Sequence, residues 1–224
     1  MRSAWFSLAG GAGALLLALA ASAAAPAAPT AQAAAVRILV PGQAAAGTPL
    51  VTAPPTAVIN GGSFAYPADG SIASIGSSSI TVSASATSTS ASAQVTSLSL
   101  FKGEIVASTV TGETHASAGT ASASGDAGVS AIADLVVLGQ PVTPTPNQQI
   151  PLGDWGYAIL LEQKSQRIDR PTPGHHDFVT ALDVFLTADH GGLQAQSEIQ
   201  IGYAESNAQA SEAAPIPVAP STPT

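Results

Sequence analysis

Four histidines and the acids beside them are the residues best suited to chemistry. One cluster is His175, His176 and Asp177, and a second is Asp189 and His190. Imidazole and carboxylate groups are ligands of zinc and similar ions. The segment between the clusters is expected to be a strand of about ten residues, which at roughly 3.3 Å per residue separates its ends by about 30 Å. The two clusters are therefore not expected to share one metal ion.

The histidine pair His175 and His176 follows Pro-Thr-Pro-Gly at 171–174 and is interpreted as a pair of exposed loop residues. A catalytic triad would have to combine these residues with His115 or His190. No Gly-x-Ser-x-Gly motif accompanies such a set. No catalytic, metal-binding or cofactor-binding residue is therefore predicted, and no cofactor is expected.

Two further groups of side chains have a possible role in binding or catalysis. Glu162 and Asp183 could lie on neighbouring strands, as the paired acids of glycosidases sometimes do, although such pairs are most often solvated surface groups. Trp155, Tyr157 and Tyr203 could form an aromatic platform for a sugar, because their rings offer flat apolar faces. Packing in the core is the preferred interpretation of these three rings.

The composition limits the class of protein. The chain has 224 residues, 9% of them charged, with a net charge of −8 and no basic stripe, so nucleic acid is not expected as a partner. It contains no cysteine. Disulfides, thiolate nucleophiles, cysteine-ligated zinc and a lipid-modified cysteine are therefore excluded.

The N-terminus has the pattern of a secretory signal peptide. Arg2 supplies a positive charge, an apolar run follows over 8–21, and Ala21-Ser22-Ala23 fits a cleavage site. Residues 1–23 are therefore predicted to be removed on export. The alternative is an uncleaved membrane anchor, since the apolar stretch extends to Ala25 and approaches the roughly 20 residues that a span needs.

The residues on either side of the predicted domain are rich in proline and alanine. Residues 24–56 are interpreted as an extended spacer, in which only 36–40 has the character of a strand. Residues 208–224 are interpreted as a disordered tail without a hydrophobic anchor or a sorting motif. One folded domain is therefore predicted over 57–207.

Within the predicted domain, apolar and polar residues alternate as in half-buried strands. The alternation runs through 80–86 and 91–96, and its phase shifts between Val95 and Leu98, which indicates a bulge or a bend. Lys102-Gly103 is predicted to be the turn of a hairpin that joins 95–101 to 104–110.

Further strands are expected at short spacing along the chain. They are predicted over 131–138, 150–152, 157–163, 178–188 and 197–206. Residues 153–156 are expected to be the turn of a second hairpin, between 150–152 and 157–163. Residues 116–128 have no bulky side chain and are interpreted either as a small-residue strand or as a loop. No amphipathic helix pattern occurs outside the leader, so the predicted fold is all-β, an antiparallel β-sandwich with Ala/Ser/Thr-rich strands. A solenoid is the alternative, but no fixed repeat supports it.

Several short stretches resemble the choice-of-anchor P family of exported bacterial proteins, mostly actinobacterial. The resemblance covers roughly 95–206. The stretches are Leu98-Ser99-Leu100-Phe101-Lys102-Gly103-Glu104-Ile105-Val106-Ala107, Ala133-Asp134-Leu135-Val136-Val137-Leu138-Gly139-Gln140-Pro141-Val142, Pro146-Asn147, Leu160-Leu161-Glu162-Gln163 and Ile201-Gly202-Tyr203-Ala204. The resemblance implies an exported or surface-associated β protein and assigns no functional residue. This chain departs from the family pattern in having no recognisable anchor at its C-terminus.

Together these observations predict a secreted or cell-surface protein with a non-enzymatic structural or adhesive role. The alternative is an extracellular carbohydrate-binding module or a secreted hydrolase. The expected partners are components of the cell envelope, or other copies of the chain joined through β-strands, with the Ser/Ala/Thr run over 77–93 as the candidate for assembly. No membrane contact is expected after removal of the leader.

Overall fold

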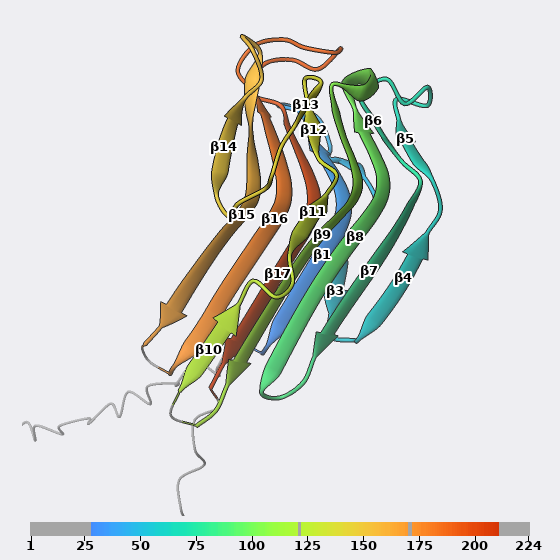
Figure 1. The fold of residues 1–224 in the computed structure, drawn as a ribbon. Helices are drawn as coiled ribbons and strands as arrows, with labels where there is room; N and C mark the ends of the chain where they lie inside the picture. The colour runs from blue at the N-terminus through green and yellow to red at the C-terminus, as the bar shows by residue number, and fades with distance from the viewer. Residues whose placement is uncertain (1–27, 121, 170–171, 211–224) are drawn as a thin grey trace, which may run out of the picture.

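A computed structural model describes residues 28–120, 122–169 and 172–210, and in it the chain forms an all-β sandwich of two antiparallel sheets (Figure 1). No helix in these ranges is long and apolar enough to cross a membrane. The predicted signal peptide, with its alternative as an anchor, and most of the predicted C-terminal tail lie outside the described residues.

The first layer, sheet A, combines the N-terminal strands with the C-terminal ones. Its members are β1 (Thr30–Leu39), β2 (Ala46–Gly47), β3 (Val51–Ala53), β14 (Gln148–Pro151), β15 (Gly156–Ile168), β16 (Gly174–Leu186) and β17 (Glu198–Gln209). Their order across the sheet is β14-β15-β16-β17-β1-β2, and β3 also pairs with β1. The first and last long strands of the chain are therefore neighbours.

The second layer, sheet B, contains the middle of the chain. Its members are β4 (Ala57–Gly61), β5 (Phe64–Tyr66), β6 (Ala73–Ile75), β7 (Ser77–Ala84), β8 (Ser88–Leu100), β9 (Ile105–Ala118), β10 (Ala123–Asp126), β11 (Ala131–Ala133), β12 (Val136–Val137) and β13 (Gln140–Pro141). The long hairpin of β8 and β9 is its centre, with β7 and then β4 beyond β8, and β10, β11 and β12 along the far side of β9. A short 3-10 turn, η1 (Phe101–Gly103), joins β8 to β9.

Both predicted hairpins are confirmed. Leu100 pairs with Ile105 across η1, and Pro151 pairs with Tyr157 across the β14–β15 turn. The sequence left residues 116–128 open as a strand or a loop. In the structure they contain the end of β9 and all of β10, which pair antiparallel from Ala118–Ala123 to His115–Asp126.

The spacer predicted over 24–56 is wrong from Thr30 onward. Residues 30–39 form β1, which pairs with β17 along nearly its whole length, and β2 and β3 follow it in the same sheet. Alanines in β1 are buried, among them Ala33 and Ala35 at 0% exposure, because the opposing sheet lies close enough to cover such small side chains. The alanines of β1 therefore fill a narrow core and do not belong to an extended spacer.

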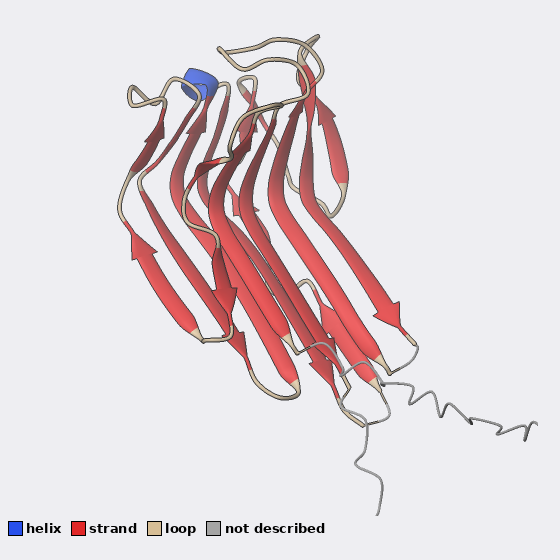
Figure 2. Ribbon diagram, turned by 180° about the vertical axis from the view of Figure 1, so that it is seen from behind, coloured by secondary structure: helices blue, strands red, loops and turns tan. Residues whose placement is uncertain are grey.

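The predicted change of phase between Val95 and Leu98 is confirmed, as a bend that extends across both sheets. In sheet B the pairing skips Ser97 and the opposite Ser108, and in sheet A it skips Leu161 and Gly202 together with Ala181. Ser97, Leu161 and Gly202 have positive φ angles. The register is the same on both sides of each skip, so these paired strands do not contain the extra residue that defines a β-bulge. The long strands bend together at this level (Figures 1 and 2), dividing the sandwich into an upper half toward η1 and a lower half toward Thr30 and Gln209.

The two halves have different cores. Most of the largest fully buried side chains are leucines and isoleucines of the upper half, such as Leu160, Leu182 and Ile199. In the lower half, β9, β10 and β17 meet through a separate cluster of alanines: Ala116, Ala118, Ala123, Ala208 and Ala210. The sheets approach most closely at the bend, where a Cβ added to Gly112 would lie 1.8 Å from the carbonyl oxygen of Gly202.

Candidate functional site

The four histidines lie in four separate places. His115 is on the outer face of sheet B, His175 lies between the sheets, His176 is on the outer face of sheet A, and His190 is at the upper end. No group of three or more His, Asp or Glu side chains within the described ranges has the geometry to hold a metal ion. The geometry therefore brings no two histidines together for catalysis.

His175 and His176 are not loop residues as predicted, because both belong to β16. Successive side chains of a strand point to opposite faces, so His175 points inward and His176 outward. Inside, His175 Nδ1 lies 2.6 Å from Oδ2 of Asp177, whose side chain is 3% exposed. A Cβ added to Gly125 of β10 would lie 1.8 Å from this oxygen, so the pair occupies a position where the two sheets nearly touch.

The ring of His190 closes the upper end of the sandwich. It stacks on Trp155 with 3.9 Å between ring centroids and meets Phe101 edge to face, while its Nε2 lies 3.1 Å from Glu104. Trp155 is only 8% exposed. Its predicted role in core packing is therefore confirmed, and it cannot belong to a surface platform for sugars.

His115 lies on the outer face of sheet B between two acids. Its Nε2 is 3.2 Å from Glu113 and its Nδ1 is 3.2 Å from Asp126, and the three side chains are 26–70% exposed. Exposed ion pairs of this kind contribute little to stability. We assign this cluster no function.

The most elaborate arrangement lies on the outer face of sheet A, the surface formed by side chains that point away from sheet B. The strand register places Gln32 beside Glu205, and Glu205 beside Phe178. Tyr203 lies on the same face, two residues before Glu205. We call His176, Glu205, Tyr203 and Gln32 the outer network.

Glu205 is the acceptor at the centre of the outer network. It accepts hydrogen bonds from the Tyr203 hydroxyl and the Gln32 amide, and its Oε1 lies 2.7 Å from His176 Nε2. Burial acts to raise the pKa of Glu205, but these three hydrogen bonds outweigh burial and hold the pKa below its usual value. Glu205 is therefore a fixed, ionised acceptor at neutral pH.

Tyr203 is held in place from two sides. Burial, together with the hydrogen bond to Glu205 and its charge, raises the pKa of Tyr203, so the hydroxyl stays protonated and remains a donor. The guanidinium of Arg37 lies 4.6 Å from the centroid of the tyrosine ring and also donates a 2.7 Å hydrogen bond to Gln200. The ring is thus half-buried with a defined orientation.

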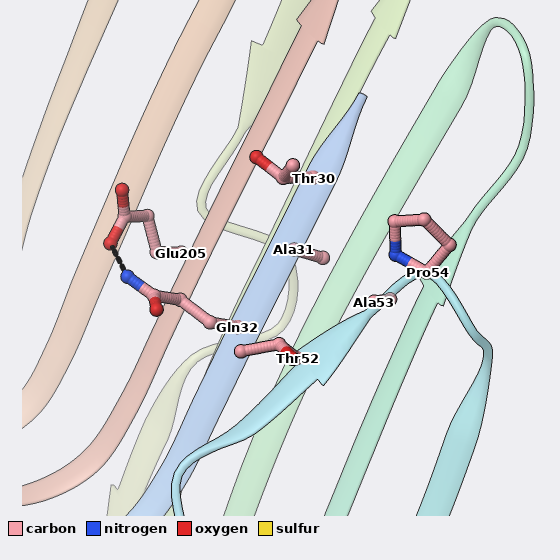
Figure 3. A pocket seen from close by; sticks show the side chains of 7 residues that line it. All are labelled: Thr30, Ala31, Gln32, Thr52, Ala53, Pro54 and Glu205. Carbon is pink, nitrogen blue, oxygen red and sulfur yellow. Dashed lines mark hydrogen bonds between the residues drawn. The ribbon is translucent and has the colours of Figure 1, made fainter. Parts of the chain in front are cut away.

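An open pocket of about 390 Å³ adjoins the outer network where β3 joins β1. Figure 3 shows Gln32 and Glu205 on one side of it, joined by a hydrogen bond, with Thr52 and Pro54 on the other. Its lining offers a carboxylate, an amide and threonine hydroxyls. Ala31, Ala53 and Pro54 add apolar surface, so the lining can pair with hydroxyl groups and also contact apolar parts of a ligand.

Glu162 and Asp183 do lie on neighbouring strands, as considered from the sequence, but Asp183 is not a solvated surface group. It is 9% exposed, and its Oδ1 has no hydrogen-bond partner within the described chain. Burial, together with the charges of Glu198 and Glu162, raises the pKa of Asp183 to about 8. Asp183 is thus mostly protonated at neutral pH.

Two aromatic rings lie on the same outer face, in the upper half. Tyr157 and Phe185 are paired across β15 and β16, with 5.4 Å between ring centroids. Both are partly exposed. Of the three rings considered for a sugar platform, Tyr157 and Tyr203 therefore share the outer face of sheet A. Trp155 is buried elsewhere, and Phe185 is a further ring on this face.

Two residues of this face were missed from the sequence. Gln32 and Arg37 fell within the predicted spacer and were given no role. The strand-like segment at 36–40, which contains Arg37, was the available signal that a strand with a patterned outer face was present there.

Comparisons with protein-family models, with curated proteins and with solved structures find no match for this chain.

Proposed function

We propose that the protein is a non-enzymatic adhesive protein of the cell surface or the extracellular medium, which binds hydroxyl-rich polymers such as polysaccharides on the outer face of sheet A. One observation carries this proposal: the outer network holds an ionised carboxylate, an amide and a tyrosine ring in fixed positions beside an open pocket with a mixed polar and apolar lining. A site whose groups are held before binding loses little entropy when a ligand arrives.

The aromatic pair supports an extended ligand. Tyr157 and Phe185 lie on the same face as the outer network, on the upper side of the bend. Aromatic rings present flat apolar surfaces to the C–H faces of sugar rings, while carboxylates and amides pair with hydroxyls. We infer that one polymer chain would cross the strands from the pocket toward these rings.

The proposed location outside the cytoplasm rests on the leader pattern at 1–23 and on the resemblance to choice-of-anchor P proteins. The small number of charges and the lack of cysteine are compatible with such a protein. Fractionation of producing cells, with mass spectrometry of the recovered N-terminus, tests the proposal. A chain that starts at or near Ala24 in the medium or envelope supports export, and an intact chain in the cytoplasm contradicts it.

Binding is tested with an array of oligosaccharides and by pull-down with insoluble polysaccharides, namely chitin, cellulose and purified cell walls. We expect Tyr203→Ala and Gln32→Ala to weaken capture about tenfold or more, since each removes a group of the outer network. Gln94→Ala is the matched control, because Gln94 is exposed on the outer face of sheet B, where its amide bonds only Thr111. Equal capture of all variants, or no capture by the unmodified protein, would reject the proposal.

A further inference from the structure

Among the described residues, sheet B ends in a strand that is paired on one side only. The outermost strand, β4, pairs with β7 on one side, and no strand in the described part of the chain pairs with its other side (Figure 1). Its backbone donors and acceptors on that side are free to pair with another strand. Two of the few large apolar side chains exposed on this protein, Val58 at 61% and Ile59 at 39%, belong to β4.

Ile59 points toward the interior like a core residue, yet its side chain remains exposed. It pairs with Ile80, which points inward and is 1% exposed, so Ile59 also faces the space between the sheets. Sheet A ends at β2 and β3 on this side. The inward face of β4 therefore continues the apolar interior past the point where the opposing layer stops.

The β4 edge has no charged side chain that would prevent it from pairing with another strand. No charged residue occurs between Arg37 and Asp69, so β4 and its flanking segments are entirely neutral. In sheet A, by contrast, the part of β15 beyond its pairing with β14 is a free edge that carries Lys164 and Arg167. Charges of this kind are a common means of preventing edge pairing. In a protein with a net charge of −8, the neutral edge is where two copies can meet with the least repulsion.

We propose that β4 pairs antiparallel with β4 of a second copy, about a two-fold axis close to Ile59. Val58 would then lie opposite Asn60 of the second copy, and Ala57 opposite Gly61. No like charges oppose one another in this arrangement, and the two Ile59 side chains cover each other's exposed inward faces. Sheet B becomes one continuous sheet across the dimer, through the same patch on both subunits.

This assignment differs from the one suggested by the Ser/Ala/Thr run over 77–93. That run lies in β7 and β8, and each of these strands already has a partner on both sides. Their backbone groups are therefore not available for assembly. The strand with a free edge is β4, which lies next to β7 at the border of sheet B.

The first test is sedimentation velocity of the full chain at increasing concentration. We expect a monomer–dimer equilibrium that Val58→Lys shifts toward monomer by about tenfold or more, because two like charges then lie on one face of the joined sheet. Asn60→Lys is a second variant with the same expected effect, and circular dichroism checks that both variants remain folded. Because all variants share the same termini, association through the ends of the chain would affect them equally.

The second test uses the absence of cysteine from the chain. In Ile59→Cys the two thiols would face each other across the axis at a separation that antiparallel pairing makes compatible with a disulfide. Ser165→Cys, on the free edge of β15, is the matched control. Rapid cross-linking of Ile59→Cys alone supports the proposal. A chain that stays monomeric, a dimer that Val58→Lys leaves intact, or equal cross-linking of the two cysteine variants overturns it.

Discussion

At the scale of single residues, the outer face of sheet A contains two carboxyl groups with opposite behaviour. Glu205 has a lowered pKa because three donors surround it, while Asp183 has a raised pKa because it is buried next to Glu198 and Glu162. The two acids lie five residues apart along the paired strands, on opposite sides of the bend, so each pKa is set by its own surroundings. Here they give the face one fixed anion and one carboxyl that holds its proton.

The raised pKa of Asp183 makes stability depend on pH. Between about pH 4 and pH 8 the folded state holds a proton that an unfolded aspartate would release, so the stability contribution of this group falls as the pH rises through that window. Asparagine at this position cannot ionise. We expect Asp183→Asn to be more stable than the unmodified protein at pH 8 by about 1 kcal/mol or more, and to show a smaller difference at pH 5.

Urea unfolding at the two pH values measures this effect. Asp154→Asn is the control, because it makes the same chemical change at a residue that is exposed in the β14–β15 turn. An Asp183→Asn variant that follows the same pH profile as the unmodified protein would show that Asp183 ionises normally.

At the scale of elements, the separation of the sheets is set by glycine and alanine. Gly112 of β9 and Gly202 of β17 bring two backbones into contact at the bend, where a single added Cβ would overlap a carbonyl oxygen. Bulky strands could not pack this closely. The high alanine content of the sequence is therefore a requirement of the geometry in the lower half.

We expect Gly112→Ala to destabilise the fold by about 3 kcal/mol or more, because the sheets must separate to admit one methyl group. Gly62→Ala provides the comparison, since a Cβ at Gly62 has no atom within 4 Å. Urea unfolding of both variants gives the free energies. Equal stabilities would mean that the backbones at the bend can move apart at little cost.

At the scale of the whole molecule, the sequence was sufficient for the fold class and for two hairpins. Alternation from Ile80 to Leu100, with its shift of phase, was enough to predict strands and a bulge or bend between Val95 and Leu98, because half-buried strands impose a period of two. It could not distinguish the bend that the structure shows from a bulge. The sequence did not predict β1, because a strand rich in alanine resembles a Pro/Ala-rich spacer in composition.

The site depended on information that one sequence does not contain. The contact between His176 and Glu205 joins residues 29 positions apart, and it requires the register between β16 and β17. Gln32 lies still further from Glu205 along the chain. Local patterns indicate which residues alternate, but the neighbours of each side chain follow from the pairing of distant strands.

The adjacency of β1 and β17 has a mechanical consequence. Thr30 pairs with Asn207 at the lower end, so the sandwich begins and ends on adjacent antiparallel strands. Their hydrogen bonds run perpendicular to the strands, and tension between the two ends would open them one after another, as a zipper opens. Under the proposed adhesive role, tension carried between the two ends of the sandwich would therefore be resisted by only a few of these hydrogen bonds at a time.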